Sequence, residues 1–121
     1  MSLVRQNILA QRLLDFTVRI ITVVNALPKT PVGRHLAAQL LQSGTSPGSN
    51  YEEACGAESK PDFVHKMGIV LKELKESLFW LRVIVRSELL PRKRVEPLIR
   101  ETQELCAIVA KSIKTARSIS Q

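Results

Sequence analysis

Residues 59–85 read SKPDFVHKMGIVLKELKESLFWLRVIV and carry the clearest helical pattern in the chain. Ser59 precedes a first turn that contains proline, and Asp62 follows three residues later, the spacing of a capping box at a helix start. Apolar side chains then recur in steps of three and four, the repeat of a helix with one buried face. They are Phe63, Met67, Val70, Leu74, Leu78, Leu81 and Val85. This stretch therefore predicts one long amphipathic helix.

Breaks on both sides of this helix divide the chain into four helical segments. Upstream, an apolar series over residues 9–27 ends at Pro28, and Thr30 with Pro31 forms the next helix start. Downstream, Pro91 marks a turn before the last apolar series. The sequence predicts a single domain, 1–121, with helices over about 3–27, 31–57, 60–88 and 92–118. Long helices with short connections pack antiparallel with their sequential neighbours, so we expect an all-α, antiparallel up-down-up-down four-helix bundle.

The second helix contains a break and a polar stripe. Pro47 lies between Gly44 and Gly48, which lowers helix propensity and predicts a kink near Pro47. The two glycines also have the spacing that permits close helix approach. Short polar side chains recur in steps of four and three: Gln39, Ser43, Ser46, Asn50 and Glu53. Such a stripe is typical of a solvated face, of a ligand cleft, or of a subunit interface or lined channel where amides and hydroxyls fix register. The sequence leaves these alternatives open.

The chain is basic, with a net charge of +7 and a pI near 9.9. Two stripes stand out, Arg5, Arg12 and Arg19 in the first helix and Lys111, Lys114 and Arg117 in the last. The first and last helices are neighbours in an up-down bundle. We therefore expect these cations to form one positive surface that binds nucleic-acid phosphates with little base readout. The alternative is that they only solvate the outer helix faces.

The sequence carries no signature of an enzyme, a metal site or a membrane span. Cys55 and Cys106 are far apart and form no CxxC pair, so we expect buried free thiols rather than a disulfide or a zinc site. His35 and His65 have no plausible set of partner ligands. Polar residues interrupt every apolar stretch, and the N-terminus lacks the layout of a secretory signal. We expect a cytoplasmic protein with no catalytic residue, no cofactor, no metal and no membrane contact.

Six short motifs point to a known family. They are QLLQSGTS (39–46), NYEEA (50–54), SKPDF (59–63), HKM (65–67), LKEL (71–74) and ESLFWLR (76–82). With these motifs the chain resembles bacterial four-helix bundle proteins, including those encoded in intervening sequences of large-subunit ribosomal RNA genes. The resemblance covers about residues 13–90 with these motifs, and the last helix more weakly. It implies a four-helix bundle, a homo-oligomeric ring that is typically a pentamer, and no enzymatic activity.

A more distant branch of the same family comprises accessory proteins of diversity-generating retroelements. It implies a basic pentameric barrel that binds nucleic acid and a protein partner, a reverse transcriptase. Two positions depart from the family pattern. Gln42 stands where arginine is usual, which argues against a polyanion contact there, and Pro47 stands where isoleucine is usual, which sharpens the expected bend.

Two functional hypotheses follow from the sequence. The first is a non-enzymatic homo-oligomer whose basic surface binds RNA or DNA, alone or together with a protein partner. The alternative is an oligomeric scaffold or adaptor in which the charge only keeps the protein soluble.

Overall fold

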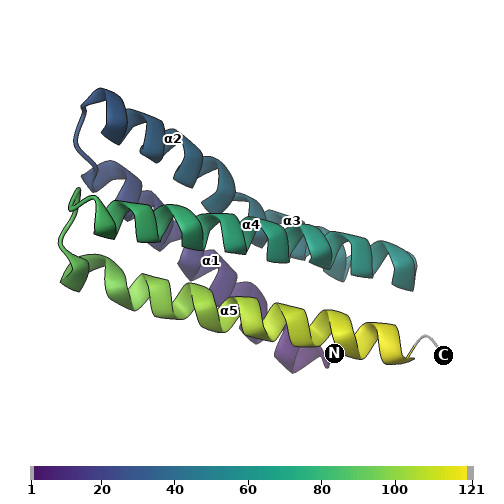
Figure 1. The fold of residues 1–121 in the computed structure, drawn as a ribbon. Helices are drawn as coiled ribbons and strands as arrows, with labels where there is room; N and C mark the ends of the chain where they lie inside the picture. Colours follow the sequence, from purple (N-terminus) through teal and green to yellow (C-terminus); the bar gives the residue numbers. More distant parts are fainter. Residues whose placement is uncertain (1, 120–121) are drawn as a thin grey trace.

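Five helical segments form the four arms of an antiparallel bundle in the computed structural model, which describes residues 2–119 (Figure 1). They are α1 (Leu3–Ala26), α2 (Pro31–Gly44), α3 (Ser46–Cys55), α4 (Lys60–Arg86) and α5 (Arg92–Ile119). The segments α2 and α3 follow one another along the same arm, and each arm runs opposite to the next. The predicted all-α, up-down-up-down four-helix bundle is confirmed.

Hydroxyl caps start three of the helices. Ser2 Oγ accepts a hydrogen bond from Arg5 N at 3.2 Å, and Thr30 Oγ1 accepts one from Gly33 N at 3.1 Å. Ser59 Oγ accepts one from Asp62 N at 3.2 Å. Each cap satisfies a backbone amide that has no acceptor inside its helix. Because these signals are local in sequence, the starts at Thr30 and Ser59 lie where they were predicted.

The turn between α4 and α5 lies near residue 90. The helix α4 ends at Arg86, earlier than the expected 88, and Glu88 has a positive φ of 58° that reverses the chain. The helix α5 starts at Arg92, as predicted, so Pro97 lies inside it on an exposed position. A proline there removes one helical hydrogen bond to the residue four positions earlier.

The predicted kink in the second arm is a break at one residue. α2 ends at Gly44, Thr45 separates the helices, and Pro47 lies in the first turn of α3, where its missing N–H has no cost. Gly44 packs directly on α1: a Cβ added there would lie 2.8 Å from Cγ1 of Ile20 and closer still to Cγ2. A Cβ on Gly48 would lie 3.4 Å from Thr17 Oγ1. Gly44 therefore lets this arm approach α1 closely, whereas the space at Gly48 would accept a Cβ in ordinary contact.

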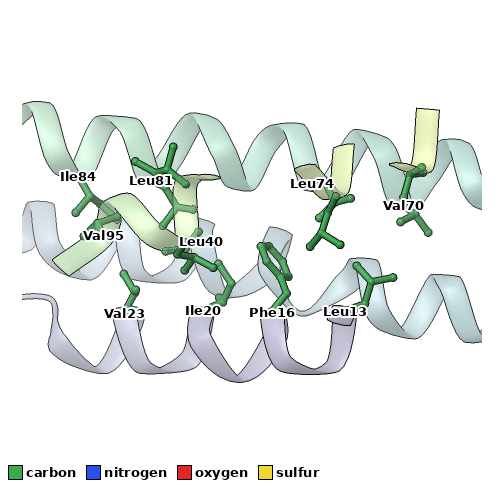
Figure 2. Packing of buried hydrophobic residues seen from close by; sticks show 14 of the residues in the cluster. Leu13, Phe16, Ile20, Val23, Leu40, Val70, Leu74, Leu81, Ile84 and Val95 are labelled. Atoms are coloured by element: carbon green, nitrogen blue, oxygen red, sulfur yellow. The ribbon is translucent and has the colours of Figure 1, made fainter. Parts of the chain in front are cut away.

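The core is an apolar layer contributed by every arm. Figure 2 shows side chains of α1 pointing toward those of α4, with Leu40 and Val95 between them. Tyr51 is the largest fully buried side chain, and its hydroxyl donates to the carbonyl oxygen of Gln6 at 3.3 Å. Burial, with a smaller contribution from a hydrogen bond to Cys55, raises the pKa of Tyr51. This residue joins α3 to the first turns of α1.

Candidate interaction surfaces

The two predicted cation stripes meet at the end of the bundle where α1 begins and α5 ends (Figure 1). Arg5 and Arg12 of α1 and Lys111 of α5 line the same cleft. The other three predicted residues are exposed and lie outside the lining of this cleft: Arg19, Lys114 and Arg117. The structure thus brings half of the predicted cations into one place and leaves the others along the outer helix faces.

Arg12 is held by carboxylates of the same chain. Its Nη2 lies 2.7 Å from Glu101 Oε1 and 3.0 Å from Glu104 Oε1, and its Nε donates to Glu101 Oε2 at 3.1 Å. The hydrogen bond to Glu101 is the largest cause of the raised pKa of Arg12, ahead of the opposing effect of burial. A forked contact of this kind fixes the guanidinium in place. Arg12 therefore joins α1 to α5, and its charge is already balanced.

A line of cations follows the outer side of α5. Lys93, Arg100 and Lys111 are exposed and separated by seven and eleven residues, which are two and three helical turns. Lys114 is exposed one turn beyond Lys111. The whole helix has seven Lys and Arg residues and three glutamates. Only the C-terminal part of this line was predicted from the sequence, although the spacing of Lys93 and Arg100 already indicates the longer one.

The polar stripe of the second arm contacts α4 within the chain. Ser43 is fully buried, and its hydroxyl accepts a hydrogen bond from Ser77 Oγ at 3.0 Å. Glu53 Oε1 lies 2.9 Å from Lys66 Nζ. Asn50 Nδ2 donates to the carbonyl oxygen and to Oγ of Ser46, at 3.0 and 2.9 Å. Gln39, Ser46 and Asn50 are half-buried, and a subunit contact at these three residues stays a prediction.

The outer side of α1 carries a second regular series, which the sequence analysis missed. Its members follow one another in alternating steps of three and four: Val4, Asn7, Gln11, Leu14, Val18, Ile21 and Asn25. All seven are exposed, and none is charged. Val4, Leu14 and Val18 expose 70%, 55% and 56% of their surface. We call this series the α1 outer seam; its signal is present in the sequence beside the core series, on the opposite face of the helix.

The model of the 23S rRNA-intervening sequence protein family matches residues 5–111. The chain belongs to this family. The chain is similar to the solved structure of a protein of unknown function from the S23 ribosomal protein family of Bacteroides thetaiotaomicron. The two chains are 33% identical with a TM-score of 0.83, and the match covers 90% of this chain and 97% of the other. No curated protein matches the chain.

The match to the 23S rRNA-intervening sequence protein family confirms the resemblance that the six motifs indicate. It extends the similarity beyond residue 13 into the N-terminal turns of α1, and it includes most of α5, where the motif resemblance is weaker. Arg5, Arg12 and Lys111 therefore all lie within the matched range, whereas Lys114 and Arg117 lie beyond it.

An aromatic group lies where α2 and α4 of this family member meet. Trp80 is half-buried, and its ring has edge contacts with Phe79, at 5.0 Å between ring centroids, and with His35, at 6.4 Å. Phe79 is 57% exposed. Trp80 Nε1 is buried without a hydrogen-bond partner among the described residues. Phe79 is thus a surface residue, and Trp80 lies at the contact between α2 and α4. Neither belongs to the fully buried core.

The cysteines, acids and histidines of residues 2–119 form no cluster that could hold a metal ion. Cys55 is exposed, contrary to the expected burial, because it is the last residue of α3 and is rotated by about 100° from the buried Ala54. Cys106 is half-buried, and burial raises the pKa of its thiol. Within this part of the chain, no group of three or more His, Cys, Asp and Glu side chains is placed to hold a metal ion. No helix in it is long and apolar enough to span a bilayer.

Proposed function

We propose that this protein is a non-catalytic, cytoplasmic homo-oligomer that binds nucleic acid through its phosphates, without sequence specificity. The observation that carries the proposal is the separation of two outer faces onto different helices. The α1 outer seam has no charge and is largely apolar, whereas the outer side of α5 is mainly cationic, with Glu104 between Arg100 and Lys111 paired to Arg12. The first face suits a second copy of the chain, and the second suits a polyanion.

The α1 outer seam has the pattern of a helix-pairing surface. Alternating steps of three and four are the spacing of paired helices, and a few amides among the apolar positions set register. Asn7, Gln11 and Asn25 supply such amides here. The centres of protein interfaces are depleted of charge because buried charges carry a desolvation cost. This seam meets that condition along the full length of α1.

The cation line of α5 supports the nucleic-acid half of the proposal. Lys93 and Lys111 are 18 residues apart, about 27 Å at 1.5 Å per residue, so the line spans several nucleotides of a strand. Contacts of lysine and arginine with phosphate release counterions and do not read bases. The family is described by an intervening sequence of ribosomal RNA, which makes RNA the first polyanion to test.

An oligomeric scaffold with no nucleic-acid role is the second candidate. It is favoured by the pairing of Arg12 with Glu101 and Glu104, because this removes one of the predicted cations from the binding surface. On this alternative the α1 outer seam still assembles subunits, and the remaining charge only keeps the assembly soluble.

The test measures assembly and binding separately. Size exclusion with light scattering gives the subunit number, and we expect a discrete oligomer that Leu14→Glu with Val18→Glu reduces to monomers. A wild-type monomer would overturn the assembly half. Fluorescence anisotropy with labelled RNA and DNA at low and high salt tests binding.

We expect Arg100→Glu with Lys111→Glu to lower affinity at least about tenfold and to reduce the salt slope. Lys72→Glu with Lys75→Glu is the matched control, because it reverses two exposed charges on α4 instead. Equal affinity of the two double variants would overturn the α5 surface, and no binding at any salt would leave the scaffold.

A further inference from the structure

A cleft of about 320 Å³ lies between the first turns of α1, the last turns of α5 and the start of α4. Its walls are mainly apolar, from Ile8, Leu9 and Ile108, with Phe63 contributed by α4. Arg5 and Lys111 lie on the two helices that bound it. Clefts that hold small ligands have volumes of roughly 300–1,000 Å³, so this one has room for a compact ligand.

We propose that this cleft receives one unstacked base of a single-stranded nucleic acid, with Arg5 and Lys111 holding the phosphates beside it. This inference rests on the proposed function and specifies which form of nucleic acid the protein prefers. It also gives Phe63 a binding role, whereas its place in the apolar series predicted only a core or interface residue.

The chemistry of the walls suits a base. An aromatic side chain and apolar neighbours provide a surface on which any base can stack. Ser112 and Thr115 bring hydroxyls into the same lining, and a hydroxyl can both donate to and accept from the polar edge of a base. An acyl chain could not form hydrogen bonds with these hydroxyls.

The charges of the lining suit the phosphates of the same strand. The lining contains three cations and no carboxylate. Because Arg12 is paired with Glu101 and Glu104, Arg5 and Lys111 are the two exposed cations that the cleft offers to a ligand. Lys111 is also a member of the cation line on α5. A strand that follows this line therefore reaches the cleft at Lys111.

The proposal predicts a preference for single strands. In a duplex each base is stacked and paired, so a duplex meets the cation line with its phosphates only. A single strand adds the stacked base to the same phosphate contacts. We expect the full chain to bind a labelled oligouridylate about tenfold more tightly than a duplex of equal length at the same salt concentration.

The test compares two phenylalanines that differ in position. Phe63→Leu removes the aromatic wall of the cleft, and Phe79→Leu removes an exposed ring outside it. We expect Phe63→Leu to weaken oligouridylate binding about tenfold and to leave duplex binding unchanged, with no effect of Phe79→Leu. Circular dichroism confirms the fold of each variant.

The outcomes separate this inference from the proposed function. Equal affinity for single strands and duplexes in all variants overturns the base cleft and leaves the phosphate surface intact. Loss of all nucleic-acid binding by the wild type overturns both. Binding of dodecanoate that is sensitive to Phe63→Leu, together with no competition from uridine monophosphate, overturns the base assignment in favour of an anionic amphiphile.

Discussion

The contact between Gly44 and Ile20 predicts opposite effects for one substitution made at two glycines. At Gly44, an added Cβ would meet the fully buried Ile20, at 2.8 Å from Cγ1 and closer still to Cγ2. Ile20 is β-branched and therefore stiff at χ1, so it has no alternative position within the core. At Gly68 of α4, an added Cβ meets nothing within 4 Å. We expect Gly44→Ala to destabilise the protein and Gly68→Ala to stabilise it.

The magnitudes follow from two opposing contributions. Replacing glycine by alanine in a helix interior stabilises it by about 1 kcal/mol, which applies in full at Gly68 and as an upper limit at Gly44, the last residue of α2. Overpacking of a well-packed core costs about 2 kcal/mol, and only Gly44→Ala incurs it. The free energy of unfolding should therefore fall by at least about 1 kcal/mol for Gly44→Ala and rise by about 1 kcal/mol for Gly68→Ala. For a chain of this length the difference corresponds to at least roughly 8 °C in Tm.

Thermal and urea unfolding of both variants measure this difference directly. Gly68→Ala is the matched control, because it makes the same chemical change inside a helix without the contact. Equal stabilisation by the two substitutions would refute the reasoning, since it would mean that the second arm does not approach α1 as closely as the structure describes. The double variant should lie near the wild type if the two sites act independently.

Three further predictions concern polar groups. Arg12→Gln, which removes the link from α1 to Glu101, should lower the free energy of unfolding in urea by about 1 kcal/mol at low salt and by less at high salt; no loss at low salt would contradict the role of this ion pair. Ser77→Ala should lower the free energy of unfolding by about 1 kcal/mol in the same assay. Ser43→Ala combined with Ser77→Ala should lower it by less than the sum of the two single changes, because the two hydroxyls are hydrogen-bonded to each other. Strict additivity would show that the hydroxyls do not interact. Burial, more than the nearby Glu76, raises the pKa of Glu73 in the folded state, so the neutral form is favoured and the stability of the wild type falls as the pH rises through that pKa. Glu73→Gln should therefore have a higher Tm than the wild type near neutral pH and the same Tm in acid below the unfolded pKa of about 4.3, and a lower Tm at neutral pH would contradict it.

The fold was predictable because its signals are local or periodic. Thr30 and Ser59 cap helices through atoms within three residues, so neighbouring sequence is sufficient to locate them. The apolar repeat then identifies the buried face of each helix. The break at Thr45 was predicted only as a kink near Pro47, because proline and glycine indicate weak helix but not the residue at which one helix ends and the next starts.

The surfaces were less predictable because they depend on which face each helix turns toward its neighbours in the packed bundle. Arg12 belongs to a regular cation stripe in the sequence, and only packing shows that Glu101 and Glu104 of α5 face it. The cleft beside Phe63 likewise arises where three helices meet, so no single stretch of sequence indicates it. The α1 outer seam is the exception: its repeat can be read from the sequence once both faces of a helix are considered.

The aromatic group between α2 and α4 gives the protein an intrinsic fluorescent probe at the contact of these two helices. Trp80 is the one tryptophan in the sequence, and its indole is partly shielded by α2 on one side and by its own helix on the other. Its emission therefore reports the separation of those two helices without any label. A fluorescence transition that coincides with the loss of helical circular dichroism would establish that the second arm and α4 part only when the whole bundle unfolds. An earlier one would identify the second arm as a unit that opens by itself.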